Sequence, residues 1–238
     1  MNILLMGNPN VGKSVVFSRL TGTNVTSSNY PGTTVEYTEG FFHWKEEVFH
    51  VIDVPGVYTL DPTNKAEEVA VDMIDKGDII INVVDATNLE RNMNLTLQLL
   101  EKNIPVIIAL NFWDEANHKG IKIDIEELES ILNVPVIPTT AVKGHGIAEL
   151  INTVINYDQK YHSHHERNDE ERWVIIGKIV KRVQQISDRK HTFSDIIDEI
   201  TIKPLSGLPI ALAVLYVAFR FIIFMGEGII GYITEPFF

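Results

Sequence analysis

Short apolar runs separated by longer mixed stretches dominate the first part of the chain. Five of them are each followed by turn residues: Ile3–Met6, Val48–Val54, Ile79–Val84, Val106–Leu110 and Val134–Ile137. Continuous apolar runs of this length are typical of buried parallel strands, and the mixed stretches between them suit crossover helices. The pattern predicts one α/β domain over residues 1–160, with a mostly parallel sheet and helices on both faces.

One further strand pattern lies directly before the second apolar run. Val35–Trp44 is separated from Val48–Val54 by only Lys45, Glu46 and Glu47. Two strand patterns joined by so short a connection form an antiparallel hairpin. We therefore expect an antiparallel strand at one side of the sheet.

The composition changes after Tyr157. Residues 158–172 are polar and charged, which predicts an exposed linker. Apolar residues at helical spacing then predict a small helical module, so that linker and module together occupy residues 161–204. Those residues are Val174, Ile175, Ile179, Val183 and Ile186, followed by Phe193, Ile196, Ile197 and Ile200.

The stretch from Leu208 to Met225 is apolar except for Arg220. Its length matches the hydrocarbon core of a bilayer, and its apolar residues outweigh one off-centre arginine. It predicts a membrane-spanning helix over residues 208–225, at the start of a membrane domain that occupies residues 205–238. A buried or interfacial helix is the alternative. Basic residues precede the span and predict that residues 1–204 lie on the cytoplasmic side.

The overall charge narrows the choice of partners. Twenty Lys and Arg residues stand against 32 Asp and Glu, for a net charge of −12. Such a surface repels polyanions, so nucleic acid is not an expected partner. The chain contains no cysteine, which excludes disulfides, zinc sites made of thiolates and cysteine nucleophiles.

Residues 7–14 read GNPNVGKS and lie between the first predicted strand and a helix. In a phosphate-binding loop, backbone N–H groups and the helix N-terminus hold the anion. Lys13 is expected to reach the β- and γ-phosphates, and the Ser14 hydroxyl to bind Mg²⁺.

Two further segments fit the same chemistry. Asp53-Val54-Pro55-Gly56 ends the strand after the hairpin turn. Asp53 is expected to hold the magnesium shell through water, and the Gly56 N–H to contact a γ-phosphate. Thr33 and Thr34 lie where a switch loop closes over magnesium and phosphate, although simple turn chemistry also explains them.

The base is predicted by residues that follow the last two apolar runs. Asn111-Phe112-Trp113-Asp114 lies at the carboxyl edge, where open α/β sheets bind ligands. Asp114 can accept hydrogen bonds from the ring N–H and the amine of guanine, which adenine does not offer in that arrangement. A helix N-cap is the alternative role for Asp114. Residues 140–144, TAVKG, are expected to supply backbone contacts to the guanine carbonyl.

Taken in order, GNPNVGKS, PGTTVE, DVPG, NFWD and TAVKG resemble the small GTPases related to Ras, and most closely the ferrous iron transport protein B family. The segment SGLPIALAVLYVAF resembles the opening of that family's membrane domain, and residues 166–204 its helical domain. The resemblance implies a Ras-like G domain, GTP and GDP as ligands, and Asn111 with Asp114 at the base. The expected nucleotide contacts are Gly7, Asn8, Pro9, Asn10, Val11, Gly12, Lys13, Ser14, Val15, Gly32, Thr33, Thr34, Asp53, Gly56, Asn111, Phe112, Asp114, Thr140, Ala141 and Val142.

Two residues depart from the Ras pattern. Val57 stands where Ras-like proteins have a glutamine that orients the attacking water, and Phe112 stands where a lysine often covers the base. In the family, an asparagine at the position of Asn10 is associated with bound K⁺, which adds positive charge near the phosphates. The expected catalytic residues are Asn10, Lys13, Thr34 and Gly56, with Ser14, Thr34 and Asp53 at Mg²⁺ and Asn10 at K⁺.

The resemblance favours a slow, potassium-activated GTPase whose nucleotide state regulates Fe²⁺ uptake through the cell membrane. It implies that the chain is a part of a longer transporter. Two alternatives stay open: a soluble GTPase of ribosome or tRNA maturation, and a membrane anchor that senses GTP and GDP without turnover. Homo-oligomerisation is also left open.

Three groups of side chains receive a non-functional interpretation. His162, His164 and His165 are interpreted as solvated rather than metal-binding. Glu67, Glu68 and Asp72 are interpreted as a solvated helix face, and Asp85 as a cap for the next loop.

Overall fold

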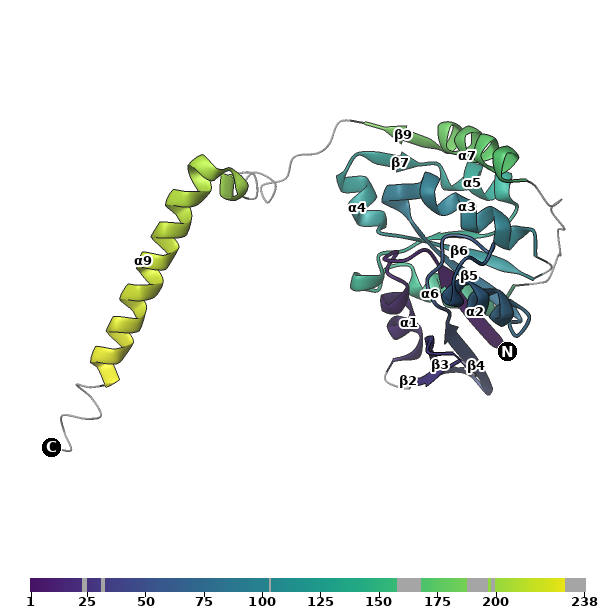
Figure 1. Ribbon diagram of the computed structural model, residues 1–238, viewed down its shortest axis with the longest axis horizontal. Helices are drawn as coiled ribbons and strands as arrows, with labels where there is room; N and C mark the ends of the chain where they lie inside the picture. The colour runs from purple at the N-terminus through teal and green to yellow at the C-terminus, as the bar shows by residue number, and fades with distance from the viewer. Residues whose placement is uncertain are drawn as a thin grey trace. The chain divides into compact units, whose positions relative to one another are not determined.

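The computed structural model describes residues 1–22, 25–30, 33–102, 104–157, 168–187, 197 and 200–229. The chain forms two compact units, Met1–Arg189 and Lys190–Phe238. The first is a sheet with helices on both faces, and the second contains one long helix (Figure 1).

The sheet of the first unit has seven strands in the order β2-β3-β4-β1-β5-β6-β8. The parallel strands are β1 (Asn2–Gly7), β4 (Glu47–Asp53), β5 (Ile79–Asp85), β6 (Val106–Asn111) and β8 (Val136–Pro138). The five apolar runs thus form the predicted parallel strands. β8 begins two residues later than predicted, after Pro135, which has no N–H to give to a sheet ladder.

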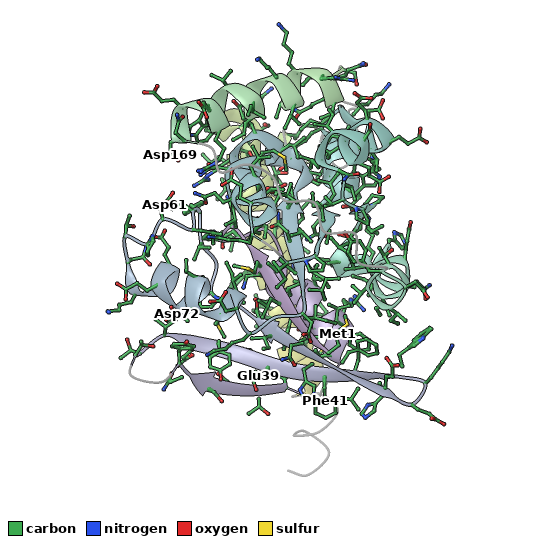
Figure 2. All side chains as sticks on the ribbon, turned by 90° about the vertical axis from the view of Figure 1, so that its right-hand side faces the viewer. Met1, Glu39, Phe41, Asp61, Asp72 and Asp169 are labelled. Carbon is green, nitrogen blue, oxygen red and sulfur yellow. The ribbon has the colours of Figure 1, made fainter. Side chains whose placement is uncertain are left out.

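β3 (Glu36–Trp44) pairs antiparallel with β4, which confirms the hairpin. β3 also pairs with an edge strand that the apolar pattern missed, β2 (Val25–Asn29), whose sequence VTSSN is mostly exposed. Figure 2 shows this edge of the sheet, with Glu39 and Phe41 of β3 labelled. The antiparallel part of the sheet is therefore larger than predicted.

Each face of the sheet has its own core. Leu4 and Met6 of β1 pack with helices α2 (Lys65–Ile74), α3 (Leu89–Leu100), α5 (Ile125–Leu132) and α7 (Asp169–Val183). Ile3 and Leu5 of the same strand pack with α1 (Lys13–Thr21) and α6 (Ile147–Ile155). Since neighbouring strand residues point to opposite faces, burial on both faces explains why these strands are apolar throughout.

The first helix of the predicted helical module belongs to the first unit. α7 buries Ile176, Ile179 and Val183 in the same core as α3 and α5. β9 (Gln184–Ile186) follows α7 and pairs antiparallel with β7 (Ile121–Ile123), a two-stranded sheet that the sequence pattern did not predict. The linker residues 158–167, with His162, His164 and His165, and the apolar positions Phe193 and Ile196 lie outside the described residues.

The second unit contains α9 (Pro204–Ile229). Within it, Ser206–Gly226 has a mean hydropathy of 2.3 and is long and apolar enough to cross a membrane. The predicted span, 208–225, falls inside this segment. The structure thus contains the helix, and its place in a membrane stays a prediction.

Candidate functional site

Loops at the carboxyl edge of the parallel strands enclose a cavity of about 490 Å³. Its lining residues are Asn8, Pro9, Asn10, Gly12, Lys13, Ser14, Val15, Gly56 and Phe112. All nine were predicted from the sequence as nucleotide contacts. The unit β1, loop 8–12 and α1 carries seven of them, and Gly56 and Phe112 follow β4 and β6, which end at the same edge of the parallel sheet.

The loop backbone depends on glycine at two points. Gly12 has φ 84°, and a Cβ there would lie 2.4 Å from the Asn111 amide nitrogen. At Gly7 a Cβ would lie 2.5 Å from the carbonyl oxygen of Val83. Because α1 begins at Lys13, the N–H groups of Lys13 and Ser14 have no partner within the helix, whereas those of Val15 and Val16 donate to the Gly12 carbonyl at 3.1 Å. This arrangement suits an anion.

Lys13, Ser14 and Asp53 lie together at the cavity. The Lys13 ammonium group donates hydrogen bonds to the Asp53 carboxylate and to the Val54 carbonyl, and both charged side chains are only 12% exposed. The Ser14 hydroxyl lies 3.5 Å from the other Asp53 oxygen. A hydroxyl beside a carboxylate is a donor set of hard oxygens, which fits Mg²⁺.

The Gly56 segment lies close to the phosphate-binding loop. A Cβ at Gly56 would be 3.2 Å from the backbone of Pro9, so the position leaves little room for a side chain. The N–H of Val57 donates to the Gly7 carbonyl at 3.2 Å, and the Val57 side chain is buried in the core. Val57 therefore cannot orient a water molecule. This agrees with the sequence, in which valine replaces the water-orienting glutamine of the Ras pattern.

The threonines of the expected switch loop do not line this cavity. The Thr33 hydroxyl donates to the Tyr30 carbonyl at 3.0 Å and accepts from the Val35 N–H at 3.2 Å, which is turn chemistry. Thr34 is exposed. Gly32 lies outside the described residues. A role for Thr34 at magnesium stays a prediction that requires this segment to move.

Asn111 joins the phosphate-binding loop to residues 139–141. Its amide nitrogen donates to the Val11 carbonyl at 2.9 Å. Its oxygen accepts from the Ala141 N–H at 3.1 Å and from the Thr139 hydroxyl at 3.3 Å. The side chain is 2% exposed, so Asn111 is a buried brace in addition to its expected place at the base.

Asp114 lies in the first turn of α4 (Trp113–His118) and pairs with Lys143 at 2.8 Å. The hydrogen bond from Lys143 holds the pKa of the Asp114 carboxyl below its usual value, against the opposing effect of burial. The N-cap of α4 is Phe112 and not Asp114, so the capping role is wrong. Phe112 has φ 58°, and its ring lies beside Gly12 at the cavity wall.

Two basic residues near the base end were missed as site residues. Lys143 belongs to the TAVKG segment, which had been interpreted as a source of backbone contacts. Its basic side chain, near a predicted carboxylate at the base, was the signal available for it. Arg19, in the last turn of α1, donates from Nε to the Ala141 carbonyl at 3.0 Å and from Nη2 to the Val142 carbonyl. No sequence pattern indicated Arg19, because its partners are backbone atoms more than a hundred residues away.

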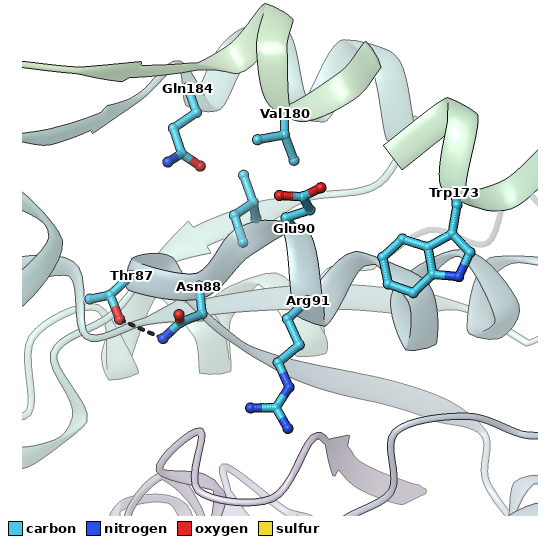
Figure 3. Close-up of a pocket in the computed structure, with 8 residues that line it drawn as sticks. Thr87, Asn88, Glu90, Arg91, Trp173, Val180 and Gln184 are labelled. Atoms are coloured by element: carbon cyan, nitrogen blue, oxygen red, sulfur yellow. Dashed lines mark hydrogen bonds between the residues drawn. The ribbon is translucent and has the colours of Figure 1, made fainter. Parts of the chain in front are cut away.

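A second cavity, of about 340 Å³, lies between the start of α3 and helix α7 (Figure 3). Arg91 lies on its wall and also borders the first site. Its carbonyl accepts from the Asn8 amide at 3.4 Å, and its guanidinium lies 4.6 Å from the centre of the Tyr58 ring. Beside it, Asp85 caps the turn η1 (Ala86–Asn88) by accepting from the Thr87 N–H, which confirms its capping role.

The interpretation of Glu67 as a solvated residue is wrong. Asp72 and Glu68 are exposed, as expected, and Figure 2 shows Asp72 at the outside of α2. Glu67 is 6% exposed and accepts hydrogen bonds from the N–H and hydroxyl of Thr63, while its own N–H donates to Asn64. Asn64 is the N-cap of α2, and the Glu67 carboxylate bonds to Thr63, one residue before the cap, in a variant of the capping box. No group of three metal-binding side chains of His, Cys, Asp or Glu occurs among the residues that the structure describes.

Comparison with known proteins extends the resemblance. The sequence model of the family described as ferrous iron transport protein B matches residues 1–154. The Fe(2+) transporter FeoB of Helicobacter pylori is 34% identical over 96% of this chain and 38% of its own length. FeoB of Legionella pneumophila strain Paris is 45% identical over 66% of this chain and 22% of its own. The chain thus spans well under half of these relatives.

Solved structures agree with the sequence comparison. The cytosolic domain of L. pneumophila FeoB superposes with a TM-score of 0.73 at 33% identity, covering 78% of this chain and all of that chain. The cytosolic domain of T. maritima FeoB in its GMPPNP form superposes with a TM-score of 0.71 at 28% identity, covering 78% of this chain and 99% of that chain. The chain therefore belongs to the ferrous iron transport protein B family, and its first 154 residues are the family's N-terminal region.

Proposed function

We propose that this chain binds GTP, hydrolyses it to GDP and phosphate, and is the nucleotide-responsive cytoplasmic part of a ferrous iron transporter. The observation that carries the proposal is the cavity at the carboxyl edge of the sheet, where Lys13, Ser14 and Gly56 meet beside Asp53. T. maritima relatives are described in GMPPNP and GDP forms, which supports guanine nucleotides as the ligands here.

The phosphates would occupy the start of α1. Backbone N–H groups of the loop and of the first helical turn provide donors, and Lys13 provides the positive charge. Lys13 contacts Asp53 and the Val54 carbonyl in the structure, so it has to exchange these partners for phosphate oxygens. The binding free energy is the difference between the two sets of contacts.

Ser14 and Asp53 would hold Mg²⁺, joined by Thr34 once its segment moves to the cavity. When bound, the ion would supply positive charge that offsets the negative charge developing on the phosphates during hydrolysis. When Lys13 contacts phosphate in place of Asp53, the Asp53 carboxylate becomes available for the magnesium shell. Gly56 would offer its N–H to the γ-phosphate.

Guanine would be recognised beside α4. Asp114 would accept two hydrogen bonds from the base, and the hydrogen bond from Lys143 lowers the pKa of its carboxyl. Residues 140–142 supply the backbone around the guanine carbonyl, and the ring of Phe112 covers the neighbouring wall. A carboxylate fixed in this way rejects adenine because adenine leaves it unpaired.

Asn10 would bind K⁺ next to the phosphates. It lies on the cavity wall with φ 66°, is exposed, and carries an amide oxygen suited to a hard cation. Because Val57 is buried and cannot orient water, hydrolysis is expected to be slow and to depend on charge supplied by such an ion.

The transport role belongs to the longer protein. We infer that residues 1–204 lie on the cytoplasmic side and that α9 begins the membrane domain, in keeping with the apolar segment Ser206–Gly226. GTP binding and hydrolysis then regulate Fe²⁺ uptake, the activity named for the curated relatives. By themselves these residues are expected to hydrolyse GTP and to move no iron.

The test is GTP turnover by the full chain in detergent with Mg²⁺, in KCl and in NaCl at equal ionic strength, with ATP as control. Several-fold activation by K⁺ with ATP inactive is expected. Asn10→Ala should abolish the activation, while Asn133→Ala is a matched control, since Asn133 is exposed with φ 55° far along the chain. Equal slow rates in both salts would remove the potassium role, and GTP binding without turnover would favour a nucleotide sensor.

A further inference from the structure

Helix α1 connects the two ends of the proposed nucleotide site. It begins at Lys13, on the phosphate side, and carries Arg19 in its last turn. The two residues are six positions apart, which is about 9 Å along the helix. Arg19 there meets the turn η2 (Ala141–Lys143), which belongs to the base side.

The contact of Arg19 is a fork on two consecutive carbonyls. Nε donates to the Ala141 carbonyl at 3.0 Å, and Nη2 donates to the Val142 carbonyl. The planar guanidinium suits two adjacent acceptors, whereas a lysine ammonium is a single point donor. The Ala141 carbonyl also accepts from the Gly144 N–H at 3.1 Å, so this bond closes the turn on itself.

The other side of the same turn is held by the base-contacting residues. Asn111 accepts from the Ala141 N–H at 3.1 Å, and Lys143 pairs with Asp114 at 2.8 Å. The turn therefore has buried support from Asn111 and outer support from Arg19. Of these two supports, only Arg19 comes from the helix that also forms the phosphate site.

We propose that Arg19 is a positioning residue for the guanine base and that it controls the rate of GDP release. The inference rests on the proposed function. With the Arg19 fork in place, residues 141–143 are already ordered when nucleotide arrives. Without it, the turn has to be ordered at each binding event, which weakens the complex mainly by faster dissociation.

The experiment is stopped-flow release of the fluorescent methylanthraniloyl derivative of GDP from the full chain in detergent. Arg19→Ala should accelerate release about tenfold, which corresponds to one or two lost hydrogen bonds to carbonyl groups. Arg19→Lys, which can fill one carbonyl position, should give an intermediate rate. Arg182→Ala is the matched control, because Arg182 pairs with Glu127 on α5, on the opposite face of the sheet from α1.

A second readout separates positioning from catalysis. Single-turnover hydrolysis at saturating GTP should change less than twofold in Arg19→Ala, because Lys13, Ser14 and Gly56 are intact. Release at the wild-type rate in Arg19→Ala would overturn the inference. If that variant does not fold, Arg19→Lys decides: an intermediate rate supports the inference, and an unchanged rate overturns it. Failure of the wild-type chain to bind the GDP probe would instead overturn the proposed function.

Discussion

The phosphate end and the base end of the proposed site are held together in different ways. At the phosphate end, Lys13 is paired with Asp53 and the Val54 carbonyl, contacts that nucleotide and metal have to replace. At the base end, Asn111 is bonded to Val11 and Ala141, contacts that a ligand at Asp114 does not have to replace, while Asp114 itself pairs with Lys143 at 2.8 Å. The loops at the base end are thus held by contacts that nucleotide can leave intact, whereas the proposed phosphate affinity is a net difference between two sets of contacts of Lys13.

The largest expected effect comes from replacing a hydrogen-bond acceptor at the base end by a hydrogen-bond donor. Asp114→Asn replaces an acceptor for two guanine N–H groups by an amide that can donate to the 2-oxo group of xanthine. We expect the preference between GTP and xanthosine triphosphate to change by roughly 10³–10⁴-fold, because a mismatched donor and acceptor leave both partners unpaired. Competition binding of the two nucleotides measures it.

The control for this exchange is Glu115→Gln, the neighbouring carboxylate on α4, which pairs with Lys119 at the surface. Its preference for GTP should equal that of the wild type. Unchanged GTP affinity in Asp114→Asn would show that Asp114 is not the base contact.

The next prediction tests whether the hydrogen bonds of Asn111 at the base end also stabilise the fold. Asn111→Ala removes the partners of the Val11 carbonyl and the Ala141 N–H, both in a buried site. Leaving two buried polar groups unsatisfied is expected to lower the free energy of unfolding by about 2–4 kcal/mol. Urea unfolding without nucleotide measures this loss.

Asn117→Ala is the matched control, since exposed Asn117 makes one bond to the Trp113 carbonyl. A change below about 0.5 kcal/mol is expected there, as for surface substitutions in general. A loss for Asn111→Ala no larger than for Asn117→Ala would contradict the role of Asn111 as a brace.

At the phosphate end, Lys13→Ala is expected to weaken GDP and GTP binding by about fiftyfold. This loss lies in the upper part of the free-energy range for one hydrogen bond to a charged group. Breaking the Lys13–Asp53 pair on binding offsets part of the attraction between Lys13 and the phosphates. Equilibrium binding of the fluorescent GDP derivative measures it, with the exposed Lys65→Ala as control, since Lys65 pairs with Glu68 in its own helix. Equal affinity in Lys13→Ala and Lys65→Ala would remove Lys13 from the site.

The same contrast explains how far the sequence could predict the fold. The parallel strands were predictable because burial on both faces requires apolar residues throughout, as in Ile3–Met6. β2 was not, because an exposed edge strand such as VTSSN needs no apolar pattern. β7 and β9 were not, because three-residue strands paired across about sixty residues leave no local signal.

For the site, the motifs GNPNVGKS, DVPG and NFWD predicted the cavity residues, with Val15 directly after the first motif, because their roles depend on residue type and on spacing within each segment. Contacts between distant segments were not predictable. Arg19 acts on backbone carbonyls, which carry no sequence information, and the burial of Glu67 depends on how Thr63 folds back over α2. Thr34 was expected at the cavity, and the structure holds it elsewhere, which a motif cannot indicate because it does not encode conformation.

The smallest expected effect comes from removing the charge of Lys143, which acts on the pKa of Asp114, while the conformation of the base end is kept. The hydrogen bond from Lys143 lowers the pKa of the Asp114 carboxyl, so removing it in Lys143→Ala should raise that pKa toward its ordinary value. A carboxyl with a lowered folded-state pKa stabilises the protein above its unfolded pKa, and the contribution is lost as the pH falls through the folded value. The variant should therefore lose ionised Asp114 at a higher pH than the wild type does.

At neutral pH Asp114 is ionised in both proteins, and the pair is exposed, so GDP affinity should fall no more than about threefold. Carbon NMR titration of the Asp114 carboxyl, together with GDP binding at pH 7, measures both quantities. Lys119→Ala is the matched control, because Lys119 forms a comparable exposed pair with Glu115 one residue along α4. A titration of Asp114 that is the same in Lys143→Ala and Lys119→Ala would show that the base end owes its charge state to the helix and not to Lys143.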